Sequence, residues 1–234
     1  MPEQNPTSAR DAAQERTLAI FDLDGTITRR DSLLPFVAGY VWRHPSRWWR
    51  LPLCLSPLVR YALGETDRGK LKGQIIQCTL GGLSKSALAP WRQTFTQRLL
   101  ARGLYAEALV CIAAHRRTQA YCVLLSASPD LYVPAIADAL GFDECICTEL
   151  RWRGDDTLDG ELLSTNRRGA EKARCVAELM AEHRPLLSYA YGNSTADLEH
   201  LQMVSSGTYV NGPALDPARW PTVRAVRWSK LGAA

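Results

Sequence analysis

The stretch from Leu18 to Thr28 constrains the fold more than any other part of the chain. Its apolar start, Leu18 to Phe21, predicts a short buried strand, and Asp22 and Asp24 follow at once. Because taking a carboxylate out of water is costly, the two acids belong at the strand's carboxyl end, where a parallel sheet opens into its ligand crevice. Two acids there can share a divalent cation, and one of them can attack an electrophile.

Strands and helices alternate after residue 106, which indicates the fold class. Continuous apolar runs are typical of strands that are covered on both faces of a parallel sheet. We expect strands near 18–21, 120–125, 144–148, 185–191 and 208–210. The alternation predicts an α/β, Rossmann-like parallel sheet with helices on both faces. The Gly- and Asp-rich residues 149–163 favour a hairpin, and the tail from Asn211 is expected to be irregular.

Residues 31–105 interrupt this alternation. Helical spacing and repeated Pro and Gly predict short helices near 32–43, 46–62, 67–79 and 84–102. We therefore expect a flexible arm at 1–16, an α/β core made of 17–30 and 106–234, and a helical cap at 31–105. A chain of 234 residues with 46% hydrophobic content is long enough to bury such a core.

The seven cysteines are an odd number without a regular framework, which favours a reduced, cytoplasmic protein. Cys145 and Cys147 lack the second pair that a zinc site needs, so both are expected in the core. Residues 1–16 lack the apolar stretch of a secretory signal, and we expect no membrane-spanning helix in the chain.

Further polar groups follow the predicted strands or begin the next helix. Ser126 precedes a predicted helix, so its hydroxyl and the backbone N–H groups from Ala127 onward are candidate phosphate contacts, as is the hydroxyl of Thr26. Lys172 stands near a helix start, where the helix dipole disfavours a cation, so an anionic partner is expected. The alternatives to Lys172 are Arg167, Arg168 and Arg174. Each feature also fits a plain helix cap or a solvated surface.

Asn193 and Asp197 flank a strand-to-helix turn, G-N-S-T-A-D, that can aim both side chains back at the first strand. With Asp22 and Asp24 they form a candidate Mg²⁺ site of oxygen ligands, to which Asp24 can also contribute its backbone carbonyl. The chemistry that we predict is in-line displacement at phosphorus. Asp22 would be the nucleophile, and Asp24 the general acid and base.

The order of these residues resembles the four motifs of the haloacid dehalogenase-like superfamily, whose members are mostly phosphomonoester hydrolases. The resemblance begins with D-L-D-G-T at 22–26 and continues through Ser126 and Lys172 to G-N-x-x-x-D at 192–197. A helical insert after the first motif resembles the phosphoserine-phosphatase-like branch. The resemblance implies magnesium, an aspartyl-phosphate intermediate and a mobile helical lid. It also implies that Asp31 faces the substrate from the cap.

One residue departs from the family pattern, which usually has Asp where Asn193 stands. An amide oxygen can still coordinate magnesium, but it carries no full negative charge, so weaker magnesium binding is expected. This departure supports an alternative function, a catalytically weak module that binds phosphorylated ligands.

The predicted cap is strongly basic, with eleven Lys and Arg against three acids between 31 and 105. This charge favours anionic substrates. Residues 43–55 combine Arg and Trp with an apolar run, which suits the surface of an anionic membrane and loosely resembles the cap of bacterial phosphatidylglycerophosphate phosphatases. We expect instead that Trp and Leu pack the cap's own core. No helix-turn-helix or RNA-binding aromatic motif is present, so nucleic acid is not an expected partner.

The sequence therefore predicts a magnesium-dependent phosphomonoesterase that acts on a small phosphorylated metabolite, such as a phosphoamino acid or a phosphoalcohol. The first alternative is a peripheral lipid-phosphate phosphatase that docks on the inner face of the membrane through residues 43–55. The second is the binding module. The identity of the phosphate ester and the oligomeric state stay open.

Overall fold

A parallel six-stranded sheet forms the centre of the molecule, in a computed structural model that describes residues 17–229. The arm expected at 1–16 lies outside the described residues. The strand order is β3-β2-β1-β6-β7-β8. The strands are β1 (Thr17–Phe21), β2 (Tyr121–Pro129), β3 (Glu144–Thr148), β6 (Leu187–Gly192), β7 (Ser206–Val210) and β8 (Val223–Val226). The predicted α/β class is confirmed, but the tail is not wholly irregular, because β8 pairs with β7 from Gly207 to Val210.

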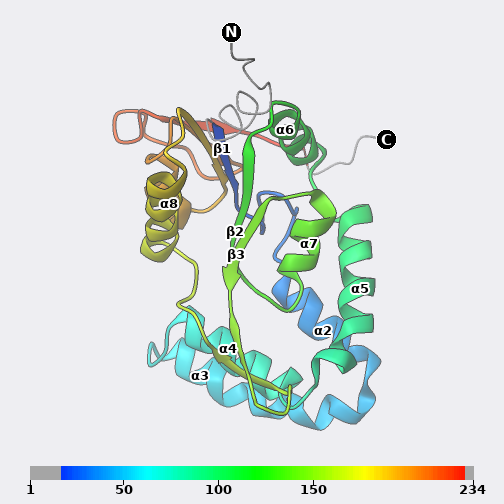
Figure 1. The fold of residues 1–234 in the computed structure, drawn as a ribbon. Helices are drawn as coiled ribbons and strands as arrows, with labels where there is room; N and C mark the ends of the chain where they lie inside the picture. Colours follow the sequence, from blue (N-terminus) through cyan, green and yellow to red (C-terminus); the bar gives the residue numbers. More distant parts are fainter. Residues whose placement is uncertain (1–16, 230–234) are drawn as a thin grey trace.

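Helices cover both faces of this sheet (Figure 1). α6 (Ala106–Arg117) and α7 (Val133–Leu140) pack on one face, and α8 (Ala170–His183) and α9 (Leu198–Leu201) pack on the other. In β1, Ala19 and Phe21 belong to the first layer, while Leu18 and Ile20 belong to the second. Successive side chains of a strand point to opposite faces, so a strand covered on both sides must be apolar throughout.

The chain between β1 and α6 forms a group of helices where the sequence predicts the cap. Its elements are α2 (Leu33–Arg43), the 3₁₀ helix η1 (Pro45–Cys54), α3 (Leu55–Ala62), α4 (Arg68–Leu80) and α5 (Lys85–Arg102). The single helix expected over 46–62 is divided at Leu55 into η1 and α3. Pro52 and Pro57 account for this division, because proline has no N–H to donate to the preceding turn.

The predicted hairpin, β4 (Leu150–Trp152) and β5 (Leu158–Leu162), is present but packs against α4 of the cap. Leu158 exchanges backbone hydrogen bonds with the segment before α5: its N–H donates to Leu83 and its carbonyl accepts from Gly82, both at 2.8 Å. Gly160 has a φ of +96°, and a Cβ there would lie 2.6 Å from Cα of Gln77 in α4. The hairpin therefore fastens the cap to the end of β3. The domain boundaries expected at 30 and 105 stay a prediction.

Candidate active site

Asp22 follows β1 directly, as predicted, and its side chain is buried. Its backbone N–H donates to the carbonyl of Tyr191 at 2.9 Å, which ties the start of the acidic loop to β6. Its two carboxylate oxygens have different partners: Oδ1 accepts from Nζ of Lys172 at 2.7 Å, and Oδ2 accepts from Oγ1 of Thr26 at 3.1 Å. Burial raises the pKa of Asp22 to about 7, although the charge of Lys172 opposes this rise.

Lys172 is only 3% exposed and lies in the first turn of α8. Its Nζ joins two acids from separate strand ends, Oδ1 of Asp22 at 2.7 Å and Oδ1 of Asp197 at 2.8 Å. Burial would lower the pKa of Lys172, but the two carboxylates raise it, so the ammonium stays charged. The anionic partner expected for this lysine is therefore present.

The arginines that were alternatives to Lys172 lie elsewhere. Arg167 pairs with Glu171 at the start of α8, and Arg174 pairs with Glu171 and Glu178 on its outer face. Arg168 is exposed. The structure therefore selects the lysine as the cation that meets Asp22.

Asp24 is fixed by hydrogen bonds from both the core and the cap. Oγ of Ser128 donates to Oδ2, and the backbone N–H of Ser32 donates to Oδ1 at 2.8 Å. Burial raises the pKa of Asp24, and the bonds from Ser128 and Ser32 partly offset that rise. The sequence analysis missed Ser128. Its spacing from Ser126 was the available signal, because residues i and i+2 of a strand share a face.

Asn193 and Asp197 come from the turn after β6 and from the 3₁₀ helix η2 (Thr195–Asp197). Gly25, with a φ of +79°, is in direct contact with the amide of Asn193: a Cβ on Gly25 would lie 2.0 Å from Nδ2. Asn193 therefore lies against the acidic loop, as the sequence predicts. A side chain larger than hydrogen at residue 25 would push it away.

Asp197 is held by more donors than any other acid of the site. Its Oδ2 accepts from the N–H of Asn193 at 3.2 Å and from both the N–H and Oγ of Ser194, at 2.9 and 2.7 Å. Burial would raise the pKa of Asp197, but Lys172 and these donors lower it. The ionised partner of Lys172 is thus Asp197, and Asp22 carries the raised pKa. His200 is buried beside Asp197, and burial lowers its pKa to about 3, so it is neutral.

Ser126 is buried near the acids, but not at a helix start. The strand β2 continues through Pro129, which pairs with Thr148, and α7 begins only at Val133. The prediction that the first turn of a helix follows Ser126 is therefore wrong, because residues 126–129 extend the sheet. Oγ of Ser126 accepts from the N–H of Ser128 at 3.0 Å, within the same strand.

The cap contributes a residue that the sequence analysis missed, Lys72 of α4. Its Nζ donates to the backbone carbonyl of Ala127 and to Oδ1 of Asn166, the latter at 2.7 Å. Burial lowers the pKa of Lys72 to about 8, while Asp24 and Asp31 oppose that shift. A lysine from the cap thus reaches the strand end that carries Ser126. No local pattern marked it, because it is one of eleven basic residues in the insert.

Asp31, the acid expected to face the substrate, is exposed. Its Oδ1 accepts from the backbone N–H groups of Leu33 and Leu34, at 3.0 and 3.4 Å, so it also closes the first turn of α2. The negative charge of Asp31 acts to raise the pKa values of both Asp24 and Lys72, so Asp31 is close enough to influence both groups. A contact between Asp31 and a substrate stays a prediction.

The candidate ligands fit magnesium by their chemistry. Within residues 17–229, no three His, Cys, Asp or Glu side chains gather closely enough to hold a metal ion by themselves. A site would therefore need the amide oxygen of Asn193 and the backbone carbonyl of Asp24 beside the carboxylates of Asp22 and Asp197. All of these are oxygen donors, which magnesium prefers. All seven cysteines are free, and Cys145 and Cys147 pack against the core, as expected.

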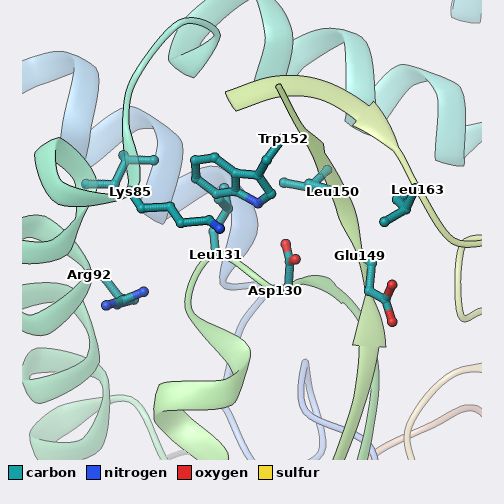
Figure 2. A pocket seen from close by; sticks show the side chains of 9 residues that line it. Lys85, Arg92, Asp130, Leu131, Glu149, Leu150, Trp152 and Leu163 are labelled. Atoms are coloured by element: carbon teal, nitrogen blue, oxygen red, sulfur yellow. The ribbon is translucent and has the colours of Figure 1, made fainter. Parts of the chain in front are cut away.

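A pocket of about 310 Å³ lies between α5 and the ends of β2 and β3 (Figure 2). Lys85 and Arg92 line its cap side, and Asp130 and Glu149 line its core side. None of the predicted site residues lines it. Oδ1 of Asp130 is buried there without a hydrogen-bond partner, and burial raises the pKa of Asp130 to about 6. The pocket is thus separate from the acids that surround Lys172.

Comparison with known proteins gives the class of the chain. Residues 19–202 match the model of the haloacid dehalogenase-like hydrolase family. The chain belongs to this family, as the order of its motifs predicted, and it is therefore an enzyme of a hydrolase family. Within residues 17–229, every helix is too short or too polar to span a membrane.

Individual relatives agree with this assignment. The chain is 31% identical to Protein CicA of Caulobacter vibrioides over 195 residues, which cover 83% of this chain and 86% of CicA. It is 29% identical to a probable phosphatase of Mycobacterium tuberculosis over 216 residues, covering 90% of this chain and 73% of that protein. A probable phosphoserine phosphatase from Vibrio cholerae has the same fold, with a TM-score of 0.69, 15% identity and coverage of 93% and 62% of the two chains.

Proposed function

We propose that this protein is a magnesium-dependent phosphomonoesterase that acts through an aspartyl-phosphate at Asp22. One observation carries the proposal: the ammonium of Lys172 joins Asp22 to Asp197 at 2.7 and 2.8 Å, in a buried site at the carboxyl ends of parallel strands. This arrangement supplies a nucleophile, a fixed cation for phosphate oxygens and a second acid at one place. The phosphatase and the phosphoserine phosphatase among the similar proteins support the same class of reaction.

The first step forms a bond between a carboxylate oxygen of Asp22 and phosphorus, while the bond from phosphorus to the leaving oxygen breaks. Asp24 gives its proton to that leaving alkoxide, a role that suits its raised pKa. Lys172 and Thr26 already contact the carboxylate of Asp22, and Ser126 is buried nearby, so they are the candidate donors to the phosphate oxygens.

In the second step Asp24, now ionised, takes a proton from water. The water oxygen attacks phosphorus, and the bond from phosphorus to Asp22 breaks. Inorganic phosphate leaves, Asp22 is a free carboxylate again, and Asp24 again carries its proton. Ser128 and the N–H of Ser32 hold Asp24 in one orientation through both steps.

Asp22, Asp197, the amide oxygen of Asn193 and the backbone carbonyl of Asp24 are the residues that would hold magnesium. When bound, the cation supplies positive charge for the oxygens of the transferring phosphoryl group. The residues of the chain act beside it: Lys172 neutralises the buried acids, and Gly25 leaves room for Asn193.

The substrate that we propose is a small phosphorylated metabolite, such as a phosphoamino acid or a phosphoalcohol. Lys72 is the cap residue best placed to meet the remainder of an anionic ester, because its Nζ reaches the backbone of Ala127. The seven free cysteines support a reducing compartment such as the cytoplasm.

Phosphate release from a panel of phosphorylated metabolites, with magnesium and with EDTA, tests this function. We expect turnover that depends on the metal and that Asp22→Asn abolishes, while circular dichroism shows the variant folded. Near wild-type release by Asp22→Asn would overturn the mechanism. If no ester in the panel is hydrolysed with magnesium but phosphorylated ligands bind, the alternative that Asn193 suggested, a binding module, is the better description.

A second candidate function is hydrolysis of a lipid phosphate. It is favoured by the large apolar side chains that η1 and α3 expose to solvent. Matched esters decide between the two: the same phosphate head group is presented as a water-soluble ester and on a diacylglycerol in mixed micelles. A kcat/KM that is higher for the soluble ester selects the metabolite, and the reverse order selects the lipid.

A further inference from the structure

The outer end of the cap exposes large apolar side chains that were expected to be buried. Six of them lie within 15 residues of sequence, and each is between 46% and 69% exposed: Trp49, Leu51, Leu53, Leu55, Val59 and Leu63. We call these six residues the cap surface. η1 has no buried residue, and α3 has only Pro57. Because exposed apolar residues this dense are unusual on a solvated face, the cap surface indicates a partner.

The two arginines of η1 point inward instead. Arg47 and Arg50 donate to backbone carbonyls at the end of α4, among them those of Thr79, Cys78 and Gly81, at 2.7, 2.7 and 2.9 Å. These carbonyls have no partner within their own helix, so the guanidinium groups satisfy them and fasten η1 to α4. The segment is thus anchored by its arginines, and its leucines are free to face outward. The expectation that Trp and Leu pack the cap's own core is therefore wrong for this segment.

The apolar residues of α3 share one side of the helix. Leu55 and Val59 of α3 and Leu63, which directly follows the helix, are spaced by four residues, so they form a stripe along it. Figure 1 shows α3 at the end of the cap away from β1. This stripe and the exposed Trp and Leu side chains of η1 together form a surface that can lie in the interface of a lipid bilayer.

The charge around the cap surface selects the kind of partner. Residues 42–70 contain six Lys and Arg and two acids, and apart from the inward Arg47 and Arg50 the exposed basic residues still outnumber the acids by four to two. A second copy of the chain would bring the same positive charge against itself, whereas a bilayer with anionic lipids offers the opposite charge. The exposed indole of Trp49, with the guanidinium of Arg50 5.6 Å from its ring, also suits a membrane–water interface. We therefore propose that the cap surface docks this protein on an anionic lipid bilayer.

Docking through this surface would act on the site described above. α4 holds η1 on one side and carries Lys72, which contacts the core at Ala127. The bilayer would therefore lie against the same group of helices that carries Lys72 to the core. In this respect the inference rests on the proposed function and deepens its second candidate, although the binding itself needs no catalysis.

Flotation of the full-length protein with vesicles tests the inference. We would compare vesicles of phosphatidylcholine with vesicles of phosphatidylcholine and phosphatidylglycerol, at low and at high salt. We expect binding to the anionic vesicles that falls as salt rises. The variant Leu55→Ser/Leu63→Ser should bind them at least roughly tenfold more weakly, because two apolar side chains no longer enter the bilayer.

A matched control removes equally exposed apolar residues elsewhere. Val110 of α6 and Leu186, which precedes β6, are each 66% exposed and lie outside the cap. The variant Val110→Ser/Leu186→Ser should bind vesicles as the wild type does. Failure of the wild type to float with anionic vesicles at low salt, or equal loss in both double variants, would overturn the inference. So would a dimer in light scattering that the Leu55→Ser/Leu63→Ser variant abolishes, because the cap surface would then bind a second copy.

Vesicle binding and phosphatase activity can be tested independently of each other. Asp22→Asn should float as well as the wild type while it loses turnover. Conversely, Leu55→Ser/Leu63→Ser should hydrolyse a water-soluble ester at the wild-type rate even when it no longer floats.

Discussion

The ammonium of Lys172 lies 2.7 Å from Oδ1 of Asp22, although 150 positions separate the two residues in the chain. The lysine also binds Asp197, so one positive charge is shared by two buried carboxylates. The acid with fewer other donors, Asp22, takes the raised pKa, and the better-satisfied Asp197 stays ionised. Parallel strands produce this convergence, because β1 and β6 are neighbours and both end at the same edge of the sheet.

Lys172→Met should destabilise the fold and abolish turnover. The substitution leaves two buried carboxylates without a cation, and breaking a buried pair in this way costs about 3 to 5 kcal/mol. Urea unfolding measures the loss. Arg174→Met, which removes an exposed cation from the same helix, should leave the free energy of unfolding close to that of the wild type.

A second substitution separates this charge effect from packing. Lys172→Met/Asp22→Asn should recover part of the lost stability, because only one buried acid then lacks a partner. If the double variant is no more stable than Lys172→Met alone, the cost comes from packing rather than from unpaired charge.

Ser128→Ala should impair the step in which Asp24 acts as a base. The hydroxyl of Ser128 donates to Asp24 and lowers its pKa, so without it the ionised form appears only at higher pH. We expect kcat to fall by about threefold to tenfold and its acidic limb to move to higher pH. The pH profile of kcat measures both changes. In an Asp24→Asn background the same substitution should have little further effect, and an equal loss there would contradict the assignment.

The sequence predicted the acids at the strand end and the alternation of strands and helices in a parallel sheet because each signal is local. An apolar run followed by carboxylates, and turns that contain Gly25 or Gly192, leave few alternatives for the backbone. The end of β2 was misplaced because Pro129 suits both the start of a helix and the last residue of a strand. Only the pairing of Pro129 with Thr148 decides between the two.

Contacts across long separations could not be predicted in the same way. Lys72 meets Ala127 only because the cap folds over the core, and Leu158 meets Leu83 only because the hairpin reaches the cap. The exposed leucines of η1 were assigned to the interior because burial is the usual fate of such residues. Arg47 and Arg50 point inward instead, because they donate to free carbonyls at the end of α4. The residues near 47–50 give no sign of these carbonyls, which lie about 30 positions further along the chain.

Lys72→Met should weaken substrate binding more than catalysis. Its ammonium is partly buried between cap and core and is influenced by the charges of Asp24 and Asp31, so it can attract an anionic ester without taking part in bond breaking. We expect KM to rise by about tenfold and kcat to change by less than about threefold. Steady-state kinetics on the best ester of the panel measure the two constants. Lys70→Met, two residues away and exposed, is the control, and a KM equally affected in both variants would refute a specific role.

Asn193→Asp should tighten magnesium binding. The replacement restores a full negative charge next to Gly25 and has almost the same shape as the amide that lies there. We expect the magnesium concentration for half-maximal activity to fall by about tenfold, and calorimetry to show the same change in affinity without substrate. In EDTA the variant should melt at a lower temperature, because a further acid then stands near Asp22 and Asp197. Unchanged magnesium affinity would remove Asn193 from the ligand set.

Asp130→Asn should stabilise the protein at neutral pH. Burial raises the pKa of Asp130 to about 6, above the value of an unfolded chain, and its Oδ1 has no partner in the pocket between α5 and β3. A carboxyl group with a raised pKa contributes its full stability below about pH 4 and loses it as the pH rises through about 6. The neutral amide avoids this loss. The free energy of unfolding should therefore exceed that of the wild type by about 2 kcal/mol at pH 7.5, and the difference should vanish near pH 4.

Urea unfolding at a series of pH values checks this difference for wild type and variant together, so that the titration of all other groups cancels. Glu149→Gln removes an exposed acid from the same pocket and should change the unfolding free energy by less than about 1 kcal/mol. A gain for Asp130→Asn that is as large at pH 4 as at pH 7.5 would show that packing, not the burial of a charge, is responsible. The slope with pH therefore tests whether the carboxyl group that faces this pocket is a cost to the fold.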